Sequence, residues 1–473
     1  MSARKTLALC VILIGIVFVM LYHFKDDTVT DTVFEDDVVT INVWYTDDAL
    51  TDYLNSAAVA YLDEYGVRVV PELHTGLEYI EEINDASVSS NCVPDLYVIG
   101  TDSLAKAAMA GLALPVLDEK NVLNQMHYPD VAINAVTYEG EKFGYPFYYE
   151  TAVLLYNETY LRMMADSTLR NEIAGSETDV SGNEVITDET TGTEVSVSEN
   201  MAPPEGYSEE EWNAAVDAKV SEMIPASVED ILNFANTYSA PPEVENIFLW
   251  DVSDIFYNYF FAGKYMNVGG IYGDDAGIID IYNDDTVACM QVYQGLNEFF
   301  SIDASQSSYE EVLDTFINGK TIFMIATTDA FAAIDEATFN GEFTWDYSVA
   351  ALPGVDAEHE AQGLSSTSAA VVNGYTLYRN EADGFARFIT YEYVDSFYDR
   401  TGKLATVVGE EDYVTDVTDL ARDMYKESIP LPKLIELSNF WIELELAYTL
   451  IWEGEDVTST LSALQDKMQQ QVE

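Results

Sequence analysis

The sequence predicts an α/β protein built around parallel β-sheet, and its first strand–helix–strand segment carries this prediction. Residues 39–45 alternate apolar and polar side chains, as a half-buried strand does. Residues 50–62 place apolar side chains on one helical face, and Gly66 is suited to end that helix. Residues 67–70 read as the next strand. A βαβ unit of this kind requires its two strands to be parallel.

Composition narrows the class of protein. The chain has 473 residues, enough for two or three domains with cores of their own. Lys and Arg together number 20, Asp and Glu 84, and the formal net charge is −64. This charge disfavours nucleic acid and anionic membrane surfaces as partners, because both are themselves negatively charged.

The N-terminus reads as a membrane-targeting segment. Arg4 and Lys5 precede an apolar run over residues 7–22, and no small-residue cleavage site follows it. We expect residues 1–25 to be an uncleaved signal anchor with its N-terminus inside the cell, and a cleaved signal peptide is the alternative. Residues 26–38 form an acidic tether. Cys10 lies in the anchor, and we expect Cys92 and Cys289 to be buried free thiols.

A second strand–helix unit follows, with a strand at residues 96–99 and a helix at residues 103–110. Asp48 and Asp102 each lie just beyond the carboxyl end of a predicted strand. Ligands of open α/β sheets bind at these ends, so both aspartates are candidate ligand contacts. Asp102 is equally suited to cap the helix that follows it.

Residues 144–157 are the segment around which the rest is organised. They begin as a proline turn and end as an apolar run typical of a strand buried on both faces. Tyr148, Tyr149 and Glu150 lie between the two parts. Such a segment is either a buried turn whose tyrosines find local partners or a hinge that lines a binding cleft.

The order of motifs resembles the maltose-binding-protein-like family, the sugar-binding receptors of bacterial ABC importers. In that family a "YP...E...L.YN" segment is the first crossover between two lobes, and its glutamate touches the ligand. The matching residues here are Tyr145, Pro146, Glu150, Leu155, Tyr156 and Asn157. Pro94–Asp95 matches the "PD" before the Asp102 loop, and the resemblance implies that Asp48 and Asp102 hydrogen-bond sugar hydroxyls.

A second match covers residues 314–331. The family's "F..Gk.AM" strand is followed by a tryptophan that stacks on the sugar. Phe316, Asn318–Gly319–Lys320 and Phe323–Met324–Ile325 resemble that strand, but no tryptophan follows it here. Thr328, Asp329 and Phe331 occupy the region and become the candidate contacts; Phe331 is the candidate stacking residue, and a core role competes with it.

Other candidates lie at strand ends and near the C-terminus. Trp250 and Asp251 end a predicted strand, whereas the aromatic residues after them, Phe256, Tyr259 and Phe260, are expected in the core. Ser365 lies in a Ser/Thr-rich bend that opens a second crossover, and a third crossover is expected near residues 410–417. Phe440–Trp441 lies in the motif that ends the family, where the tryptophan stacks on ligand; Trp452 is more readily a core residue.

The resemblance implies a two-lobed periplasmic-binding-protein-like fold of type II, in which each lobe is a central β-sheet flanked by helices. Residues 166–222 lack a sustained apolar period, and the family has only a short link here, so they read as an acidic insertion; within it, residues 175–200 are either a small hairpin or disordered. The expected division assigns residues 39–148 and 366–413 to lobe 1, and residues 149–365, with the insertion, and 414–473 to lobe 2.

The implied function is that of an extracellular receptor, not an enzyme. It would capture a carbohydrate, in particular an oligosaccharide, by hinge closure and deliver it to the permease subunits of an ABC importer. Aromatic faces and dispersed carboxylates suit sugar rings and hydroxyls. We expect a monomer on the outer face of the cytoplasmic membrane, with no cofactor and no metal. A receptor for a peptide or polyamine is the alternative, and an extracellular glycosidase is a further one.

Overall fold

The computed structural model describes residues 38–89, 93–181, 202–300, 302, 307–408, 415–435, 437 and 439–472. The predicted anchor at residues 1–25, Cys92 and most of the third expected crossover therefore lie outside the described residues. Among the helices within these ranges, none has the length and apolar character needed to cross a membrane. Cys289 is a buried free thiol.

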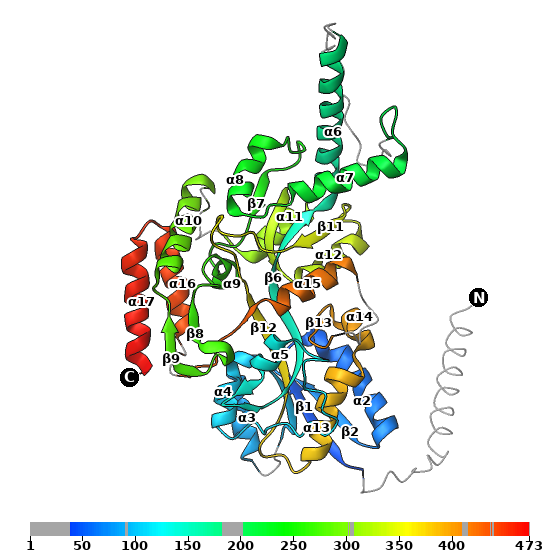
Figure 1. Cartoon of the computed structure of the whole chain (residues 1–473). Coiled ribbons are helices and arrows are strands. Elements are labelled where there is room, and N and C mark those ends of the chain that lie inside the picture. The colour runs from blue at the N-terminus through cyan, green and yellow to red at the C-terminus, as the bar shows by residue number, and fades with distance from the viewer. Residues whose placement is uncertain are drawn as a thin grey trace, which may run out of the picture.

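The chain forms two lobes, one above the other in Figure 1, and strands β6 and β12 run between them. A mixed sheet extends through both lobes in the order β2-β1-β3-β12-β6-β10-β7; β11 and β13 also pair with β6, and β14 pairs with β12. The strands of this sheet are β1 (Thr40–Tyr45), β2 (Arg68–Leu73), β3 (Leu96–Gly100), β6 (Tyr145–Asn157), β7 (Asn246–Leu249), β10 (Thr321–Thr327), β11 (Tyr347–Ala350), β12 (Leu364–Val372), β13 (Leu404–Ala405) and β14 (Ile429–Pro430).

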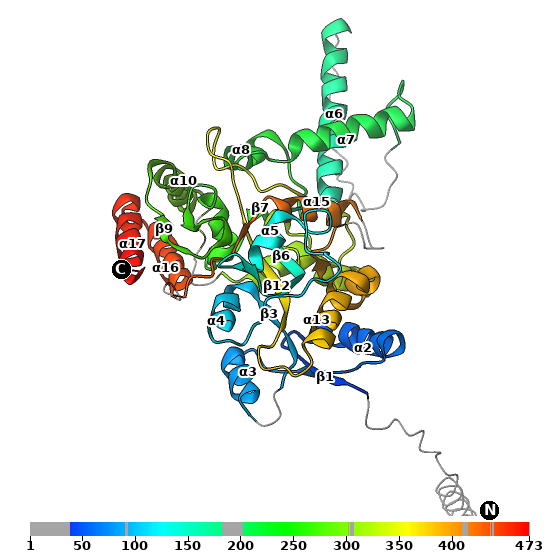
Figure 2. The same cartoon turned by 60° about the horizontal axis from the view of Figure 1, so that its bottom comes forward.

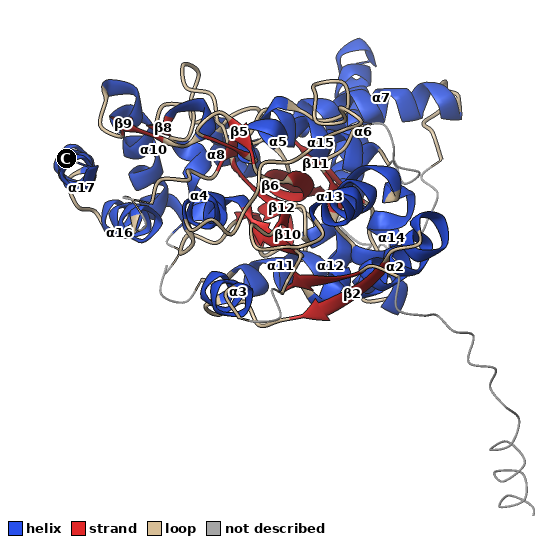
Figure 3. Cartoon of the chain, turned by 90° about the horizontal axis from the view of Figure 1, so that it is seen from below, coloured by secondary structure: helices blue, strands red, loops and turns tan. Residues whose placement is uncertain are grey.

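The first lobe contains the predicted βαβ unit. Strand β1 pairs in parallel with both β2 and β3, as the sequence pattern required. Helices cover both faces of this part of the sheet, as the view from below in Figure 3 shows. The helices and short strands of this lobe are α2 (Thr51–Tyr65), α3 (Tyr79–Ser87), α4 (Leu104–Met109), α5 (Asp130–Ala135), β4 (Thr137–Tyr138), β5 (Glu141–Lys142), α13 (Arg379–Arg387) and α14 (Phe397–Thr401).

The second lobe is built on β7, β10 and β11 and on the far half of β6. Helix α15 packs against β6 and β11, and α16 and α17 pack on each other at the outer edge of the lobe, where Figure 1 shows them. The helices and short strands that complete this region are α6 (Glu158–Ser181), α7 (Glu209–Met223), α8 (Val228–Thr237), α9 (Ile255–Asn258), β8 (Asn267–Gly269), β9 (Asp275–Asp280), α10 (Asp284–Phe300), α11 (Tyr309–Ile317), α12 (Ala330–Asn340), α15 (Asp416–Lys426), α16 (Phe440–Trp452) and α17 (Val457–Val472).

Strand β6 changes partners along its length. Its first half, from Tyr145 to Thr151, pairs antiparallel with β12, whereas Ala152 to Tyr156 pair antiparallel with β10. The change of partner therefore falls between Thr151 and Ala152. Glu150 lies next to this point, opposite Ser366 of β12.

The far half of β6 is buried on both faces, which explains its continuous apolar run. Val153 and Leu155 belong to one hydrophobic core, and Ala152, Leu154 and Tyr156 belong to another. Successive side chains of a strand point to opposite faces, so one strand supplies both cores. Each large apolar side chain that is fully buried in this way contributes about 1.5–3 kcal/mol.

The expectation of a hairpin or disorder in residues 175–200 is wrong for residues 175–181, and the expected lack of an apolar period in residues 166–222 is wrong as well. Helix α6 continues to Ser181 and projects from the second lobe in both Figure 1 and Figure 2, and α7 packs against its base. Residues 182–201 lie outside the described residues. An apolar helical period is in fact present in α7; its buried members are Trp212, Val216, Val220 and Met223.

Polar contacts hold α7 to α6. The Trp212 Nε1–H donates to Asp166 Oδ1 at 2.8 Å, and Arg162 pairs with Asp217 at 2.7 Å. Ser208 and Glu211 form a capping box at the start of α7. The two contacts between the helices join residues that lie far apart in the sequence and could not be predicted locally, whereas the apolar period and the capping box of α7 are local signals that were overlooked.

Candidate ligand-binding site

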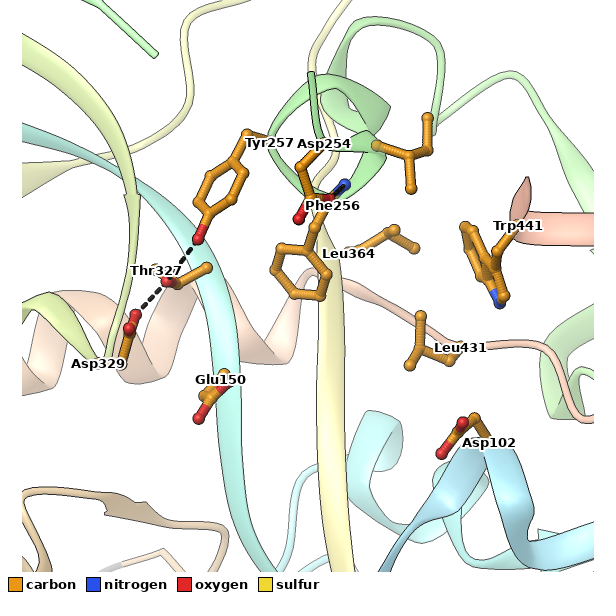
Figure 4. A pocket seen from close by; sticks show the side chains of 11 residues that line it. Asp102, Glu150, Asp254, Phe256, Tyr257, Thr327, Asp329, Leu364, Leu431 and Trp441 are labelled. Atoms are coloured by element: carbon orange, nitrogen blue, oxygen red, sulfur yellow. Dashed lines mark hydrogen bonds between the residues drawn. The ribbon is translucent and has the colours of Figure 1, made fainter. Parts of the chain in front are cut away.

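Two adjoining cavities lie between the lobes and share Glu150 as a lining residue. The first has a volume of about 350 Å³. Its lining, drawn in Figure 4, consists of Asp102, Glu150, Asp254, Ile255, Phe256, Tyr257, Thr327, Asp329, Leu364, Leu431 and Trp441. The second has a volume of about 430 Å³ and is lined by Thr46, Asp47, Asp48, Tyr148, Glu150, Ser366 and Ser368. We call them the aromatic cavity and the polar cavity.

Lys403 pairs with two carboxylates that line the polar cavity. Its Nζ lies 3.0 Å from Asp47 Oδ2 and 3.2 Å from Glu150 Oε1. The ammonium also lies over the ring of Tyr148, 5.1 Å from the centroid, and the Tyr148 hydroxyl donates to Asp47 Oδ2 at 3.4 Å. Burial alone would lower the pKa of Lys403, but the Glu150 carboxylate, Tyr148 and the Asp47 carboxylate together outweigh burial and raise it.

Asp47 and Asp48 reach the polar cavity from the end of β1. Asp47 caps the short 3₁₀ turn at Asp48–Leu50, where its Oδ1 accepts the N–H of Ala49 at 3.1 Å. This turn leaves Asp48 exposed beside the cavity. The carboxyl end of a parallel strand thus delivers two carboxylates to the cleft, as the sequence pattern predicts for open α/β sheets.

Helix α9 supplies much of the aromatic cavity in the second lobe. Asp254 caps this helix, because its Oδ1 accepts the N–H of Phe256 at 2.8 Å. The cap fixes the chain so that Phe256 points into the cavity in Figure 4. Burial raises the pKa of Asp254.

A chain of hydroxyl groups holds Asp329 beside this wall. The Tyr257 hydroxyl lies 3.4 Å from Thr327 Oγ1, which in turn bonds to Asp329 Oδ1 (Figure 4). The Tyr309 hydroxyl donates to Asp329 Oδ1 at 3.2 Å, and its ring stacks on Tyr257 with centroids 4.6 Å apart. One carboxylate oxygen is therefore engaged by protein donors.

Trp441 and Asp102 lie toward the other end of the aromatic cavity, on opposite lobes (Figure 4). Trp441 is the second residue of α16 and is partly buried, with its ring edge-on to Tyr259 at a centroid distance of 5.9 Å. Asp102 is exposed at the end of β3, and the protein around it raises the pKa of its carboxyl through desolvation.

Comparison with known proteins gives a likeness in structure only. No family model and no curated protein sequence matches the chain. A cyclo/maltodextrin-binding protein complexed with maltotetraose matches with a TM-score of 0.67 and 19% sequence identity over 92% of this chain and 98% of that one. The extracellular solute-binding protein of Staphylococcus aureus, in complex with maltose, matches with a TM-score of 0.66 and 15% identity over 92% and 98%. MalX of Streptococcus pneumoniae, in complex with maltopentaose, matches with a TM-score of 0.63 and 17% identity over 90% and 99%.

The chain has their fold. The two-lobed architecture expected from the sequence motifs is thereby confirmed, and it extends over nearly the whole length of these neighbours. The sequence identities are too low for the ligand contacts of these neighbours to be assigned to residues of this chain. The roles of its lining residues therefore follow from its own geometry.

The structure gathers part of the predicted site around the cleft. The predicted residues that line one or both cavities are Asp48, Asp102, Tyr148, Glu150, Asp329 and Trp441. Their contact with a ligand stays a prediction. These residues come from both lobes and from the strand between them.

Three of the aromatic residues predicted to contact the ligand lie in the core and do not line the cavities. Trp250 is fully buried, and its Nε1–H donates to Asn258 Oδ1 at 2.9 Å. Tyr149 is buried against the ring of Tyr425, with centroids 3.8 Å apart. Phe331 is the second residue of α12 and is buried in the core, and the aromatic residues that line the aromatic cavity are Phe256, Tyr257 and Trp441.

Three predicted polar contacts are also buried outside the cavity linings. Asp251 Oδ1 accepts the N–H of Ser253 at 2.8 Å and the Ser253 hydroxyl at 2.6 Å. Thr328 Oγ1 accepts the N–H of Thr151 at 3.4 Å, and the Ser365 hydroxyl donates to a backbone carbonyl at 3.4 Å. Their hydrogen bonds serve the protein's own turns and strands.

The sequence analysis missed several lining residues. It placed Phe256 in the core with Tyr259 and Phe260; the latter two are buried, but Phe256 lines the cavity. An N-cap aspartate directly before an apolar helix, as in Asp254–Ile255, is a local signal that could have found this wall. Lys403 carries no comparable signal, because its contact with Glu150 spans 253 positions of the sequence.

Proposed function

We propose that this protein is an extracellular receptor that binds a carbohydrate between its lobes and delivers it to an ABC importer. The observation that carries the proposal is the lining of the cleft. Carboxylates from both lobes line the two cavities, which share Glu150, and the partly buried ring of Trp441 and the ring of Phe256 line one of them. Carboxylates accept hydrogen bonds from sugar hydroxyls, and aromatic faces cover the apolar faces of sugar rings.

The ligand that suits this cleft is an oligosaccharide. The aromatic cavity and the polar cavity adjoin at Glu150, so one extended ligand can occupy both. One end of such a ligand would rest on aromatic rings and the other would meet hydroxyls and carboxylates. The structural neighbours were solved with maltotetraose, maltose and maltopentaose, which are consistent with this ligand class.

Capture would proceed by hinge closure. Strand β6 passes between the lobes and changes partner from β12 to β10 between Thr151 and Ala152. A small rotation at this point moves Trp441 relative to Asp102 and closes both cavities over the ligand. The lobes of this proposal are residues 39–148 with 366–413 and residues 149–365 with 414–473.

The proposed cellular setting comes from the N-terminal sequence. Residues 1–25 would hold the receptor, as a monomer, on the outer face of the cytoplasmic membrane, where permease subunits accept the ligand. N-terminal sequencing of the native protein should begin at Met1 or Ser2, and a start near residue 25 would show a cleaved signal peptide instead.

A cationic solute is the second candidate. Carboxylates on Asp102, Asp254 and Asp329 line the aromatic cavity, and within the described part of the chain no Lys or Arg side chain pairs with them. A polyamine or basic peptide would find negative charge there. The carboxylates also leave an extracellular glycosidase as an alternative, which needs two of them about 5–9.5 Å apart.

Isothermal titration calorimetry separates these candidates. The full-length protein, in a detergent without a sugar headgroup, is titrated with maltotetraose, with spermidine and with a basic tripeptide. We expect maltotetraose to bind and to be recovered intact. Binding of spermidine or the peptide without the sugar would replace the proposal, and release of reducing ends that disappears in Glu150→Gln would identify a glycosidase.

A further inference from the structure

Lys403 differs from the other basic residues that the structure describes in its relation to the cleft. Among the ion pairs of the described residues, it is the one lysine or arginine that contacts carboxylates of either cavity lining. It contacts two of them, Asp47 and Glu150, which come from the end of β1 and from the crossing strand. The polar cavity therefore has a built-in counter-ion.

The local fold fixes the position of this lysine. Helix α14 ends at Gly402, whose φ of 66° lets the chain turn back, and Leu404 directly after Lys403 pairs with Tyr149 of β6. The turn is thus tied to the strand that carries Glu150. The Lys403 side chain is 15% exposed, and its ammonium lies over the ring of Tyr148. Such a residue is held in place before any ligand arrives.

This position has a consequence for what the polar cavity can bind. The three carboxylates of the polar cavity, Asp47, Asp48 and Glu150, would together attract a cationic ligand, but the Lys403 ammonium contacts two of them and offsets part of this charge. Each ionised carboxylate has about four acceptor positions, so both keep free positions for hydroxyl groups. A neutral ligand rich in hydroxyls can use these positions, whereas a second cation would have to approach Lys403.

We propose that Lys403 is the specificity-determining residue of this cleft, which holds Asp47 and Glu150 as acceptors for neutral sugar hydroxyls and excludes cationic solutes from the polar cavity. The inference rests on the proposed function, since it assumes that the cleft binds sugar. The raised pKa of Lys403 keeps its ammonium charged at neutral pH.

Two of the three aspartates that line the aromatic cavity already accept hydrogen bonds from the protein. Asp329 accepts hydrogen bonds from Thr327 and Tyr309, and Asp254 caps a backbone N–H. We therefore assign the discrimination against cations to the polar cavity.

The test replaces the lysine and measures two ligands. Lys403→Met keeps the length of the side chain and removes its charge; Lys403→Arg keeps the charge. Lys106→Met is the matched control, because Lys106 pairs with Glu81 on the exposed surface of the same lobe and its loss changes the net charge equally. Calorimetry with maltotetraose and with spermidine is run on the full-length chain and each variant.

We expect Lys403→Met to weaken maltotetraose binding at least tenfold and to tighten spermidine binding at least tenfold. Lys403→Arg should retain sugar binding and exclusion of spermidine, and Lys106→Met should leave both unchanged. The gain of spermidine binding should fall as salt is raised, because it is electrostatic. Loss of sugar binding without any gain for spermidine would overturn the proposal and leave Lys403 a merely structural residue.

A charge-balanced double variant covers the case in which Lys403→Met folds poorly. Asp47→Asn combined with Lys403→Met removes one charge of each sign and should exclude spermidine again. If the proposed function itself is wrong, the result differs, because the unmodified protein would then bind no sugar or would already bind spermidine. Native spermidine binding comparable to that of Lys403→Met would contradict the role of Lys403 whatever the sugar result.

Discussion

Replacing Trp441 by alanine should weaken sugar binding much more than it weakens the fold. Trp441 is partly buried at the start of α16 and presents its ring to the aromatic cavity, across from Asp102 (Figure 4). Its contacts in the protein are ring contacts with Phe440 at 5.0 Å and with Tyr259 at 5.9 Å. Replacement of Trp441 by alanine therefore removes one face of the aromatic cavity, whereas Phe440 and Tyr259 keep their other packing contacts.

The expected loss of affinity follows from the area of the ring. A tryptophan buries roughly 150–250 Å² when it is fully covered, so a stacked sugar covers on the order of 70 Å² of it. At about 25 cal/mol per Å² this area contributes about 1.7 kcal/mol, which is a roughly 20-fold rise in Kd on truncation. The loss of stability should be about 1–2 kcal/mol, less than the 3–5 kcal/mol typical of a fully buried tryptophan.

Trp452 provides the matched control within the same helix. Its side chain is buried against the ring of Trp250, with centroids 5.7 Å apart, and its Nε1–H donates to Ile302 O at 3.3 Å. Trp452→Ala should lower the free energy of unfolding by about 3–5 kcal/mol and change the Kd of the folded protein little. Calorimetry with maltotetraose and urea unfolding are measured on both variants.

The reverse pattern would refute the reasoning. If Trp441→Ala lowered stability as much as Trp452→Ala while the folded fraction kept its affinity, Trp441 would be a core residue. The aromatic cavity would then lack its stacking face, and the assignment of a sugar to this cleft would lose its main apolar contact.

Two further predictions concern ionisable groups. Glu150→Gln should weaken maltotetraose binding about tenfold, because the amide is a poorer acceptor for hydroxyls and loses its ion pair with Lys403, and unchanged affinity would exclude Glu150 from the site. Lys433 is buried, its Nζ donates to Asn134 O at 2.8 Å and to Ala135 O at 3.2 Å, and burial lowers its pKa from 10.5 to about 8. The unfolded chain then binds more protons between about pH 8 and pH 10.5, so the free energy of unfolding should rise by roughly 3 kcal/mol across this window. Lys433→Met should lack this rise in urea unfolding, and an identical pH profile would contradict it.

Much of the architecture could be predicted from the sequence because its signals are local. The alternation in residues 39–45 and the apolar run after Glu150 gave the correct strands, and β6 does cross between the lobes. The helix of residues 209–223 was missed although its apolar period and capping box are local signals, and its packing on residues 158–181 could not be predicted locally because Trp212 and Asp166 lie 46 positions apart.

The site was less predictable for the same reason. The end of a strand places several side chains near the cavity, but tertiary packing decides which of them line the cavity and which are buried in the core. At the end of β7 the sequence favoured Trp250 and Asp251, yet the structure buries both and presents Phe256, five residues beyond Asp251. Lys403 reaches Glu150 only because β13 pairs with β6, and no local pattern encodes that pairing.

Small-angle X-ray scattering with and without maltotetraose tests the central claim most directly, because it reports on ligand and hinge together. The full-length protein, in detergent matched to the solvent contrast, should show a smaller radius of gyration when saturated with the sugar, as the lobes close about β6 and β12. Trp441→Ala should need a correspondingly higher sugar concentration to reach the same value. A radius of gyration that stays constant while calorimetry shows saturation would contradict closure of the two lobes around a carbohydrate.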